Sequence, residues 1–424
     1  MKDIRGGVCA PKGFKAGGVW CGIKKSSQKR DLAIIYSEKP CTSAAMFTTN
    51  IVQAASVIVS REHLAGSIAR GGGIQAVIAN SGNANACTGE AGLSAARRMA
   101  ALTAQSLSIE PDNVAVASTG VIGAPLPLPV IEEGIKPLAA ALTADEAGHS
   151  AALEAIMTTD TRKKDGALQI SLDGVPVSLG GMVKGSGMIH PNMATMLGFI
   201  TTDAAISREL LDKALRRAVH LSFNRITIDG DTSTNDTILI MANGEAGNSP
   251  ITSENDAYRE FSAALENLCI ALARKMAADG EGASRLLTVN VSGAAEERSA
   301  EILAKSVASS SLVKAAIFGA DANWGRVLCA LGYAGIPFDP SGVDVSFASA
   351  EGSVGVCRAG EAIPFSEEDA KRILLKEEIE IIIKLYDTKS YDTGSGKAIG
   401  AGSASVWGCD LTYDYVKING DYRS

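Results

Sequence analysis

Apolar runs and amphipathic stretches alternate along the first half of the chain. Four short runs rich in small and β-branched apolar residues are typical of buried strands, at residues 32–36, 55–59, 75–79 and 114–120. Between the last two, residues 90–107 space their apolar side chains for one face of a helix. This alternation of strands and helices predicts an α/β fold.

The rest of the chain continues the alternation. Two helical patterns fill residues 129–157, and Asp173-Gly174 between two apolar runs predicts a hairpin. Further strands are predicted at residues 196–201, 286–291, 312–318 and 378–383, and further helices at residues 207–221 (with Ser207 as N-cap), 256–278, 301–306 and 324–333. Because the strands are apolar on both faces, we expect sheets that are covered by helices.

Composition and charge narrow the class of protein. The chain has 424 residues, of which 46% are hydrophobic and 21% charged, which is close to the average of a globular protein. The net charge of −7 argues against a nucleic-acid partner, because that function needs a basic face. No apolar run approaches the length of a membrane helix, and the first residues lack an apolar signal core. We therefore expect a cytoplasmic protein without a membrane partner.

The cysteines and histidines indicate no metal site. The eight cysteines are scattered without a CxxC pair, and none of the four histidines has a partner at HxxxH spacing. A Ser-His-Asp or Cys-His mechanism would have to recruit one of only four histidines: His63, His149, His190 and His220. His149 is predicted in a polar loop, and only His190 lies in a segment with other unusual features.

The segment at residues 181–200 is the most unusual in the chain. It places Lys184 before Gly185-Ser-Gly187, breaks at Pro191 and starts a strand at Thr195. A phosphate-binding loop does not fit, because its lysine follows the glycines and precedes a helix. The residues leave two interpretations open. One is a glycine-rich bend between strands, and the other is a cleavage at Ala194-Thr195, after which the α-amine of Thr195 serves as base for its own hydroxyl.

Pro191-Asn-Met-Ala-Thr-Met-Leu197 resembles the self-cleavage site of the ornithine acetyltransferase family, the glutamate N-acetyltransferases of the arginine pathway. The resemblance covers nearly the whole chain. The matching motifs are Ala10-Pro-Lys-Gly-Phe14, Phe47-Thr-Thr-Asn50, the segment 80–89, Ser118-Thr-Gly-Val-Ile-Gly123, Met157-Thr-Thr-Asp-Thr161, Asp279-Gly-Glu-Gly-Ala283, the segment 318–326 and Ile418-Asn-Gly-Asp-Tyr-Arg-Ser424.

The resemblance implies an αββα-type sandwich and a threonine nucleophile. Cleavage between Ala194 and Thr195 would give an α piece, residues 1–194, and a β piece, residues 195–424. In the family reaction, Thr195 takes the acetyl group of N2-acetylornithine and passes it to glutamate in a ping-pong sequence. The resemblance further implies no metal, no cofactor and an α2β2 assembly, which is a heterotetramer.

The resemblance also assigns the other site residues. Thr119 and Gly120 match the oxyanion hole, which holds the negative charge of the tetrahedral intermediate. The positions that match substrate contacts are Thr158, Lys184, Thr195, Glu281, Asn419 and Ser424. Within this set, we expect Lys184 to hold the substrate carboxylate and Glu281 to pair with the side-chain ammonium of ornithine.

Three alternatives remain beside this interpretation. A bifunctional enzyme would also use acetyl-CoA as a donor to make N-acetylglutamate. An aminopeptidase or amidohydrolase would use the same processed threonine with water as acceptor. An uncleaved binding protein for amino acids would show a single intact band on a denaturing gel. A product assay with glutamate present separates the transferase from the hydrolase.

Overall fold

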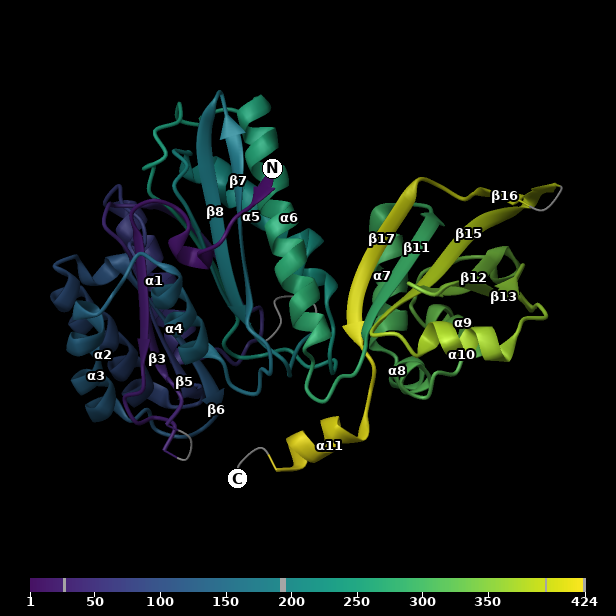
Figure 1. Cartoon of the computed structure of the whole chain (residues 1–424), viewed down its shortest axis with the longest axis horizontal. Helices are drawn as coiled ribbons and strands as arrows, with labels where there is room; N and C mark the ends of the chain where they lie inside the picture. The colour runs from purple at the N-terminus through teal and green to yellow at the C-terminus, as the bar shows by residue number, and fades with distance from the viewer. Residues whose placement is uncertain (26–27, 191–195, 393–394, 422–424) are drawn as a thin grey trace. The chain divides into compact units, whose positions relative to one another are not determined.

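The computed structural model describes residues 1–25, 28–190, 196–392 and 395–421. Within them the chain forms two compact units. Unit 1 comprises residues 1–224 and 231–272, and unit 2 comprises residues 225–230 and 273–424. This division differs from the predicted α and β pieces, which are defined by a cleavage site and stay a prediction. Figure 1 labels many of the helices and strands of both units.

Unit 1 contains two sheets. Its four-stranded sheet has the order β2 (Phe14–Val19), β3 (Leu32–Ser37), β5 (Ala76–Asn83), β6 (Val114–Val121). Its six-stranded sheet has the order β1 (Lys2–Asp3), β7 (Lys164–Leu172), β8 (Val175–Lys184), β9 (Leu197–Thr202), β10 (Thr237–Ala242), β4 (Thr42–Phe47). The predicted hairpin joins β7 to β8, with Leu172 opposite Val175.

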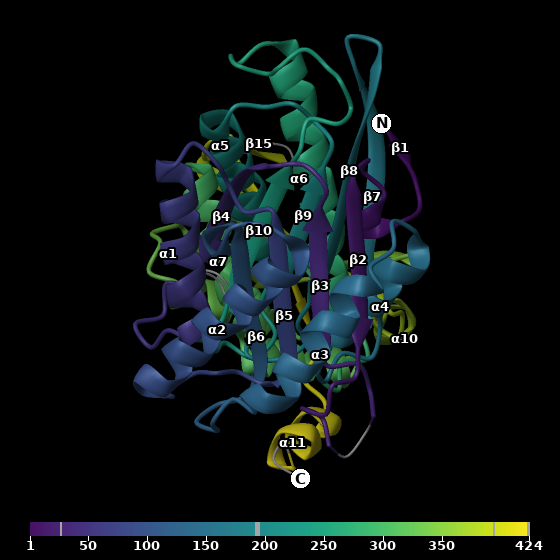
Figure 2. The ribbon, with the colours of Figure 1, turned by 90° about the vertical axis from the view of Figure 1, so that its left-hand side faces the viewer.

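Alternate side chains of β3 show how the two sheets of unit 1 are layered. Leu32 and Ile34 pack against helices α1 (Ala55–Ala69), α2 (Gly89–Leu107) and α3 (Leu128–Ala140). Ala33 and Ile35 face the other way, into a core that they share with residues of the six-stranded sheet. Burial on both faces explains why the strand is a continuous apolar run. Figure 2 shows α2 and α3 in front of this sheet and α1 at its left-hand side.

Helices also cover the outer face of the six-stranded sheet. Helix α6 (Asp256–Ala278) places Leu268 and Leu272 over Gly166 and Gly181, which are opposite each other in β7 and β8. Helix α5 (Arg208–Leu221) packs beside β4. Unit 1 therefore has the order helices, sheet, sheet, helices. The predicted α/β class and αββα sandwich are confirmed.

Helix α4 (Glu146–Ile156) is an addition to this sandwich, because its apolar side chains enter the core between the sheets. It lies almost on the backbone of β2. A Cβ atom added at Gly18 would lie 2.0 Å from the carbonyl oxygen of Ala151, so only glycine allows this approach. The chain leaves α4 directly into the loop at residues 157–161, so the packing on β2 sets where that loop begins.

Unit 2 is a sheet with helices on one face. The strand order is β14 (Glu361–Ala362), β13 (Gly352–Arg358), β12 (Val343–Ser349), β15 (Glu378–Asp392), β11 (Leu286–Ala294), β17 (Gly402–Cys409), with β16 (Ser395–Ala398) paired to β15. Its helices are α7 (Glu297–Ser309), α8 (Ser311–Phe318), α9 (Trp324–Gly332), α10 (Glu367–Leu374) and α11 (Tyr413–Gly420). In β15, Ile379, Ile381 and Ile383 pack under the helices, while Glu380 and Lys384 are exposed on the other face.

Two predicted strands are helices. Residues 55–59 form the first turns of α1, in which burial recurs at Val59, His63 and Ser67, the spacing of one helical face. Residues 312–318 belong to α8, which begins where the Ser310 hydroxyl accepts a hydrogen bond from the N–H of Val313, at 3.3 Å. A short apolar run does not by itself distinguish a strand from a buried helix.

Candidate active site

Asp160 ties the loop after α4 to the end of β8. Its carboxylate accepts hydrogen bonds from the N–H groups of Thr158 at 3.0 Å and Gly185 at 2.8 Å, and from the Lys164 ammonium at 2.5 Å. Burial alone would raise the pKa of Asp160, but Lys184 and Lys164 hold it well below its usual range. The carboxylate is therefore charged at neutral pH, and it fixes Thr158 beside the strand that ends in Lys184.

Lys184 joins the two sheets of unit 1 at this point. It is the last residue of β8, its side chain is buried, and its Nζ atom donates to Oγ1 of Thr119 in β6 at 3.1 Å. Because Thr119 Oγ1 accepts this bond, its own hydroxyl proton is available to another acceptor. The structure thus brings together four of the predicted site residues: Thr119, Gly120, Thr158 and Lys184.

Gly120 follows Thr119 where β6 runs against β5. Its φ of 132° lies in the region that favours glycine, and a Cβ atom there would lie 2.4 Å from the carbonyl carbon of Gly82. The two glycines are opposite each other in the parallel pair of strands. Any side chain at this position would push the strands apart, so the close approach accounts for the glycine.

Asp236 lies in the same unit, just before β10. It is fully buried, and its Oδ1 atom accepts a hydrogen bond from the N–H of Met196 at 2.9 Å. Its Oδ2 atom has no hydrogen-bond partner among the described residues. Burial raises the pKa of Asp236 well above its ordinary value, against the opposing effects of the Met196 N–H and of Lys184. The structure therefore places a buried acid on the backbone N–H of Met196, the first described residue after the predicted cleavage site.

Glu281 and Asn419 meet each other in unit 2. Asn419 in α11 donates through Nδ2 to Glu281 Oε2 at 2.9 Å. A second contact supports the first, because the Thr412 hydroxyl donates to the carbonyl of Gly282 at 2.7 Å. The side chain of Glu281 is buried in spite of its charge. The structure brings these two predicted site residues together.

Three predicted positions lie outside the described residues: Ala194 and Thr195 of the cleavage site, and Ser424. The roles assigned to all the site residues stay predictions.

The prediction that His149 lies in a polar loop is wrong. His149 lies in α4 and is buried; its Nδ1 atom accepts from the N–H of Val8 at 3.3 Å, and Nε2 is 2.8 Å from Asp165 Oδ2. It therefore fixes the N-terminal segment on the sandwich. Among the residues that the structure describes, no group of three or more His, Cys, Asp or Glu side chains could hold a metal ion.

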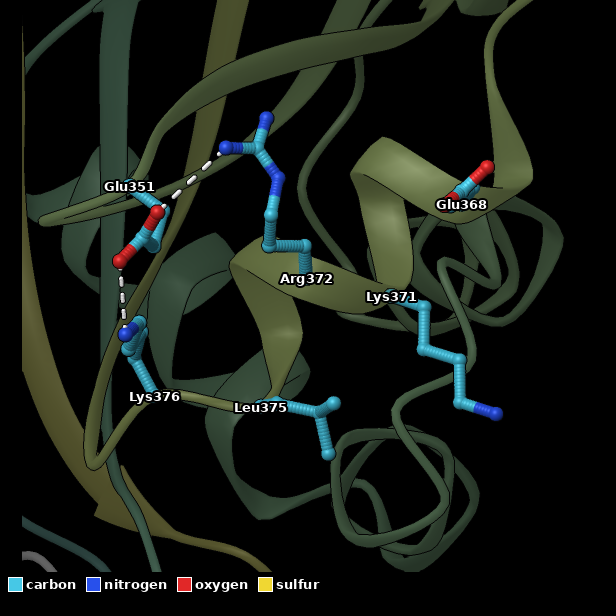
Figure 3. A pocket seen from close by; sticks show the side chains of 6 residues that line it. All are labelled: Glu351, Glu368, Lys371, Arg372, Leu375 and Lys376. Atoms are coloured by element: carbon cyan, nitrogen blue, oxygen red, sulfur yellow. Dashed lines mark hydrogen bonds and ion pairs between the residues drawn. The ribbon is translucent and has the colours of Figure 1, made fainter.

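A hollow on unit 2 contains none of the predicted site residues (Figure 3). It lies beside α10, where Glu351 pairs with Arg372 at 3.4 Å and with Lys376 at 2.7 Å. Both pairs are at the surface, where ion pairs contribute little to stability. The helices within the described parts of the chain include none that is long and apolar enough to cross a membrane.

Sequence reasoning did not assign roles to Asp160 or Asp236. Asp160 lies inside the motif at residues 157–161. One of the backbone N–H groups that it binds is that of Gly185, which follows β8 and is not part of this motif. Asp236 is the last residue of a polar loop before an entirely buried strand. An acid at the entry to such a strand is a signal that could have been found, because a buried carboxyl group needs a specific environment.

Known proteins that are similar to this chain show which family it belongs to. Residues 15–424 match the model of the ArgJ family. The chain belongs to the ArgJ family. It is 50% identical over 425 residues to the arginine biosynthesis bifunctional protein ArgJ of Symbiobacterium thermophilum, with 100% of both chains covered. It is 45% identical to that of Bacillus licheniformis, with 100% of this chain and 98% of the relative covered.

A solved structure is also similar to part of the chain. It is the ornithine acetyltransferase of Mycobacterium tuberculosis complexed with ornithine, 38% identical, covering 46% of this chain and 99% of that one with a TM-score of 0.41. Membership of the ArgJ family confirms two predictions from the sequence: the family itself, and an acetyltransferase of arginine biosynthesis as the class of activity.

Proposed function

We propose that the chain is a glutamate N-acetyltransferase that moves the acetyl group of N2-acetylornithine to glutamate through an ester on Thr195. Family membership and the meeting of Thr119 with Lys184 support this proposal. The main structural support for this proposal is the contact between Lys184 and Thr119. It places a cation that can bind a carboxylate next to a hydroxyl group that can donate to an oxyanion.

In the first half-reaction, the hydroxyl oxygen of Thr195 attacks the acetyl carbonyl carbon. The Thr195 α-amine, freed by cleavage after Ala194, accepts the hydroxyl proton. Thr119 and Gly120 donate to the oxygen that becomes negative. The bond to the ornithine nitrogen then breaks, and that nitrogen takes the proton. In the second half-reaction, the glutamate amine attacks the ester carbonyl carbon and loses a proton to the Thr195 amine. The bond between the acetyl carbon and the Thr195 oxygen then breaks, that oxygen takes the proton back from the amine, and N-acetylglutamate leaves.

Charged groups would orient the substrates in this scheme. Lys184 holds the carboxylate that both substrates carry, and Thr158 lies beside it on the loop fixed by Asp160. Glu281 remains the candidate for the ornithine ammonium, and Asn419 and Ser424 for further substrate contacts. The α and β pieces form an α2β2 heterotetramer in the cytoplasm; this assembly and location are part of the proposal.

A second candidate function is favoured by one observation, the word "bifunctional" in the names of the relatives. A bifunctional enzyme would also take the acetyl group from acetyl-CoA and deliver it to glutamate through the same ester.

The test is an acetyl-transfer assay with two donors, N2-acetylornithine and acetyl-CoA, with glutamate as acceptor. Product from the first donor alone supports the transferase, and product from both supports the bifunctional form. Release of acetate without N-acetylglutamate would instead identify a hydrolase. A chain that runs as a single band of full length and transfers no acetyl group would contradict the proposal.

A further inference from the structure

Asp31 fixes a short loop next to the predicted oxyanion hole. Its buried carboxylate accepts hydrogen bonds from three backbone N–H groups, those of Cys21 at 2.7 Å, Gly22 at 3.2 Å and Lys24 at 2.9 Å. A fully buried carboxylate is costly to keep unless its oxygens are satisfied in this way. The arrangement holds the backbone of Lys24 in one place.

The side chain of Lys24 runs from this loop past the end of β5 to the loop after α4. Its stem passes Gly82, where an added Cβ atom would lie 3.1 Å from Lys24 Cγ. Gly82 is the strand partner of Gly120. The Nζ atom then donates to the carbonyl of Met157 at 2.7 Å and to that of Arg30 at 3.1 Å. The ammonium therefore lies beside Thr158, the residue that follows Met157.

Several charges surround this ammonium. Burial lowers the pKa of Lys24 to about 8; Asp31 and Asp160 oppose the shift, while Lys184 and Lys29 add to it. The site thus contains a second cation, which is partly removed from water and whose charge is repelled by that of Lys184.

From this placement we propose that Lys24 binds the side-chain carboxylate of glutamate, the acetyl acceptor. The proposal rests on the proposed function. N2-acetylornithine carries one carboxylate, whereas glutamate carries two. If Lys184 holds the carboxylate that both substrates share, only glutamate offers a second one to Lys24. Lys184 helps to lower the pKa of Lys24, and a dicarboxylate offsets this repulsion because it offers one carboxylate to each ammonium.

The same residue can tolerate the ornithine side chain. An amine whose pKa is about 8 gives up its proton far more readily than an exposed lysine. When the donor places its own ammonium nearby, Lys24 can become neutral, and its repulsion of the donor falls. One lysine therefore suits a site that receives opposite side-chain charges in its two half-reactions.

The test compares Lys24→Met with Lys25→Met. The first variant keeps an apolar stem on Gly82 and removes the ammonium; the second removes the neighbouring exposed ammonium as a matched control. Acetylation of the enzyme by N2-acetylornithine is measured in single turnover. Deacetylation of the preformed acetyl-enzyme is then measured with glutamate and, separately, with glutamine, which lacks the side-chain carboxylate.

We expect Lys24→Met to lower kcat/KM for glutamate in deacetylation by about ten- to hundredfold, the effect of losing a charge-assisted hydrogen bond. Acetylation by N2-acetylornithine and deacetylation by glutamine should stay close to wild type, so the preference for glutamate over glutamine collapses. Lys24→Arg should restore much of that preference, and Lys25→Met should leave it unchanged.

Equal losses with glutamate and glutamine, or an unchanged preference, would overturn the proposal. If Lys24→Met does not fold, the wild-type enzyme provides the second measurement. Its preference for glutamate over glutamine should fall as the pH rises through about 8, because Lys24 loses its charge; a constant preference would also overturn the proposal. A wild-type chain that completes neither half-reaction would contradict the proposed function instead.

Discussion

At the scale of single residues, the hydroxyl of Thr119 is the group whose role can be isolated most cleanly. Thr119→Val removes the hydroxyl and keeps the shape of the side chain. We expect kcat for acetyl transfer to fall by about 100- to 1,000-fold, the typical effect of losing one oxyanion-hole donor. The KM values should change little, because this bond strengthens only in the transition state. Steady-state kinetics with N2-acetylornithine and glutamate measure both quantities.

Thr103→Val is the matched control for this change. It also removes a buried threonine hydroxyl from unit 1, one that donates to the carbonyl of Met99 within α2 at 2.8 Å. Its kcat should remain near that of the wild type. A loss in Thr119→Val no larger than in Thr103→Val would show that Thr119 has only a structural role.

Asp236 leads to a prediction about stability and pH. Because burial raises its pKa well above the unfolded value, the folded protein keeps the proton over a pH range in which the unfolded chain has lost it. The contribution of Asp236 to stability is therefore greatest below about pH 4 and declines as the pH rises towards the folded-state pKa. Asp236→Asn cannot ionise and avoids this decline.

The free energy of unfolding should thus shift in favour of Asp236→Asn, relative to the wild type, as the pH is raised from about 4 to 7. Denaturant unfolding of both proteins at several pH values measures this difference, with Thr195→Ala as the background so that both chains are uncleaved. A difference that does not change with pH would mean that Asp236 has no raised pKa.

At the scale of elements, the contact of α4 with β2 positions the loop that carries Thr158. Gly18→Ala would place a methyl group against the backbone of Ala151, so the helix must move away from the strand. We expect the free energy of unfolding to fall by roughly 1–3 kcal/mol, as for other overpacked cores. Acetyl transfer should fall as well, because the loop at residues 157–161 begins where α4 ends.

Gly332→Ala in α9 is the control, since a Cβ atom there meets nothing within 4 Å. It should leave both the free energy of unfolding and the transfer rate near their wild-type values. If Gly18→Ala behaves in the same way, the close approach of α4 to β2 does not determine the position of the loop.

The elements themselves were predictable where their pattern was long. The periodicity of residues 256–278 predicts a helix with the bounds that α6 has, because many turns of one apolar face leave no alternative. The runs at 55–59 and 312–318 are too short to show a period. Their helical state depends on tertiary packing and, for α8, on a cap at Ser310 just before the run.

At the scale of the whole molecule, the predicted α and β pieces are interleaved in one sheet. Strand β9 lies between β8 and β10, and β10 in turn pairs with β4. Since β8 and β4 precede residue 194 while β9 and β10 follow residue 195, backbone hydrogen bonds join the two pieces on both sides. Cleavage at Ala194-Thr195 leaves these bonds intact.

We therefore expect the two pieces to elute together in size-exclusion chromatography and to separate only in denaturant. A denaturing gel of the eluted peak should show both pieces in equal amounts. Elution of a free piece in native buffer would contradict the observed pairing of β8 with β9.

The candidate site shows what sequence can and cannot provide. The resemblance to the ornithine acetyltransferase family predicted Thr119, Gly120, Thr158 and Lys184 as site residues, and the structure brings all four together. Nothing in the local sequence shows that the carboxylate of Asp160 connects residue 158 to residue 185, or that Lys24 reaches the carbonyl of Met157. Asp160 and Gly185 are 25 residues apart in the sequence, and Lys24 and Met157 are 133 residues apart, so both contacts exist only in the folded chain.

The most direct test of the account is to locate the acetyl group on the enzyme. The cleaved protein is mixed with N2-acetylornithine without glutamate, digested and analysed by mass spectrometry. The account predicts one acetyl group on the peptide that begins with Thr195, and its disappearance, with formation of N-acetylglutamate, when glutamate is added. Release of ornithine in stoichiometric amount with no acetyl group on Thr195, or with the acetyl group on another residue, would contradict it.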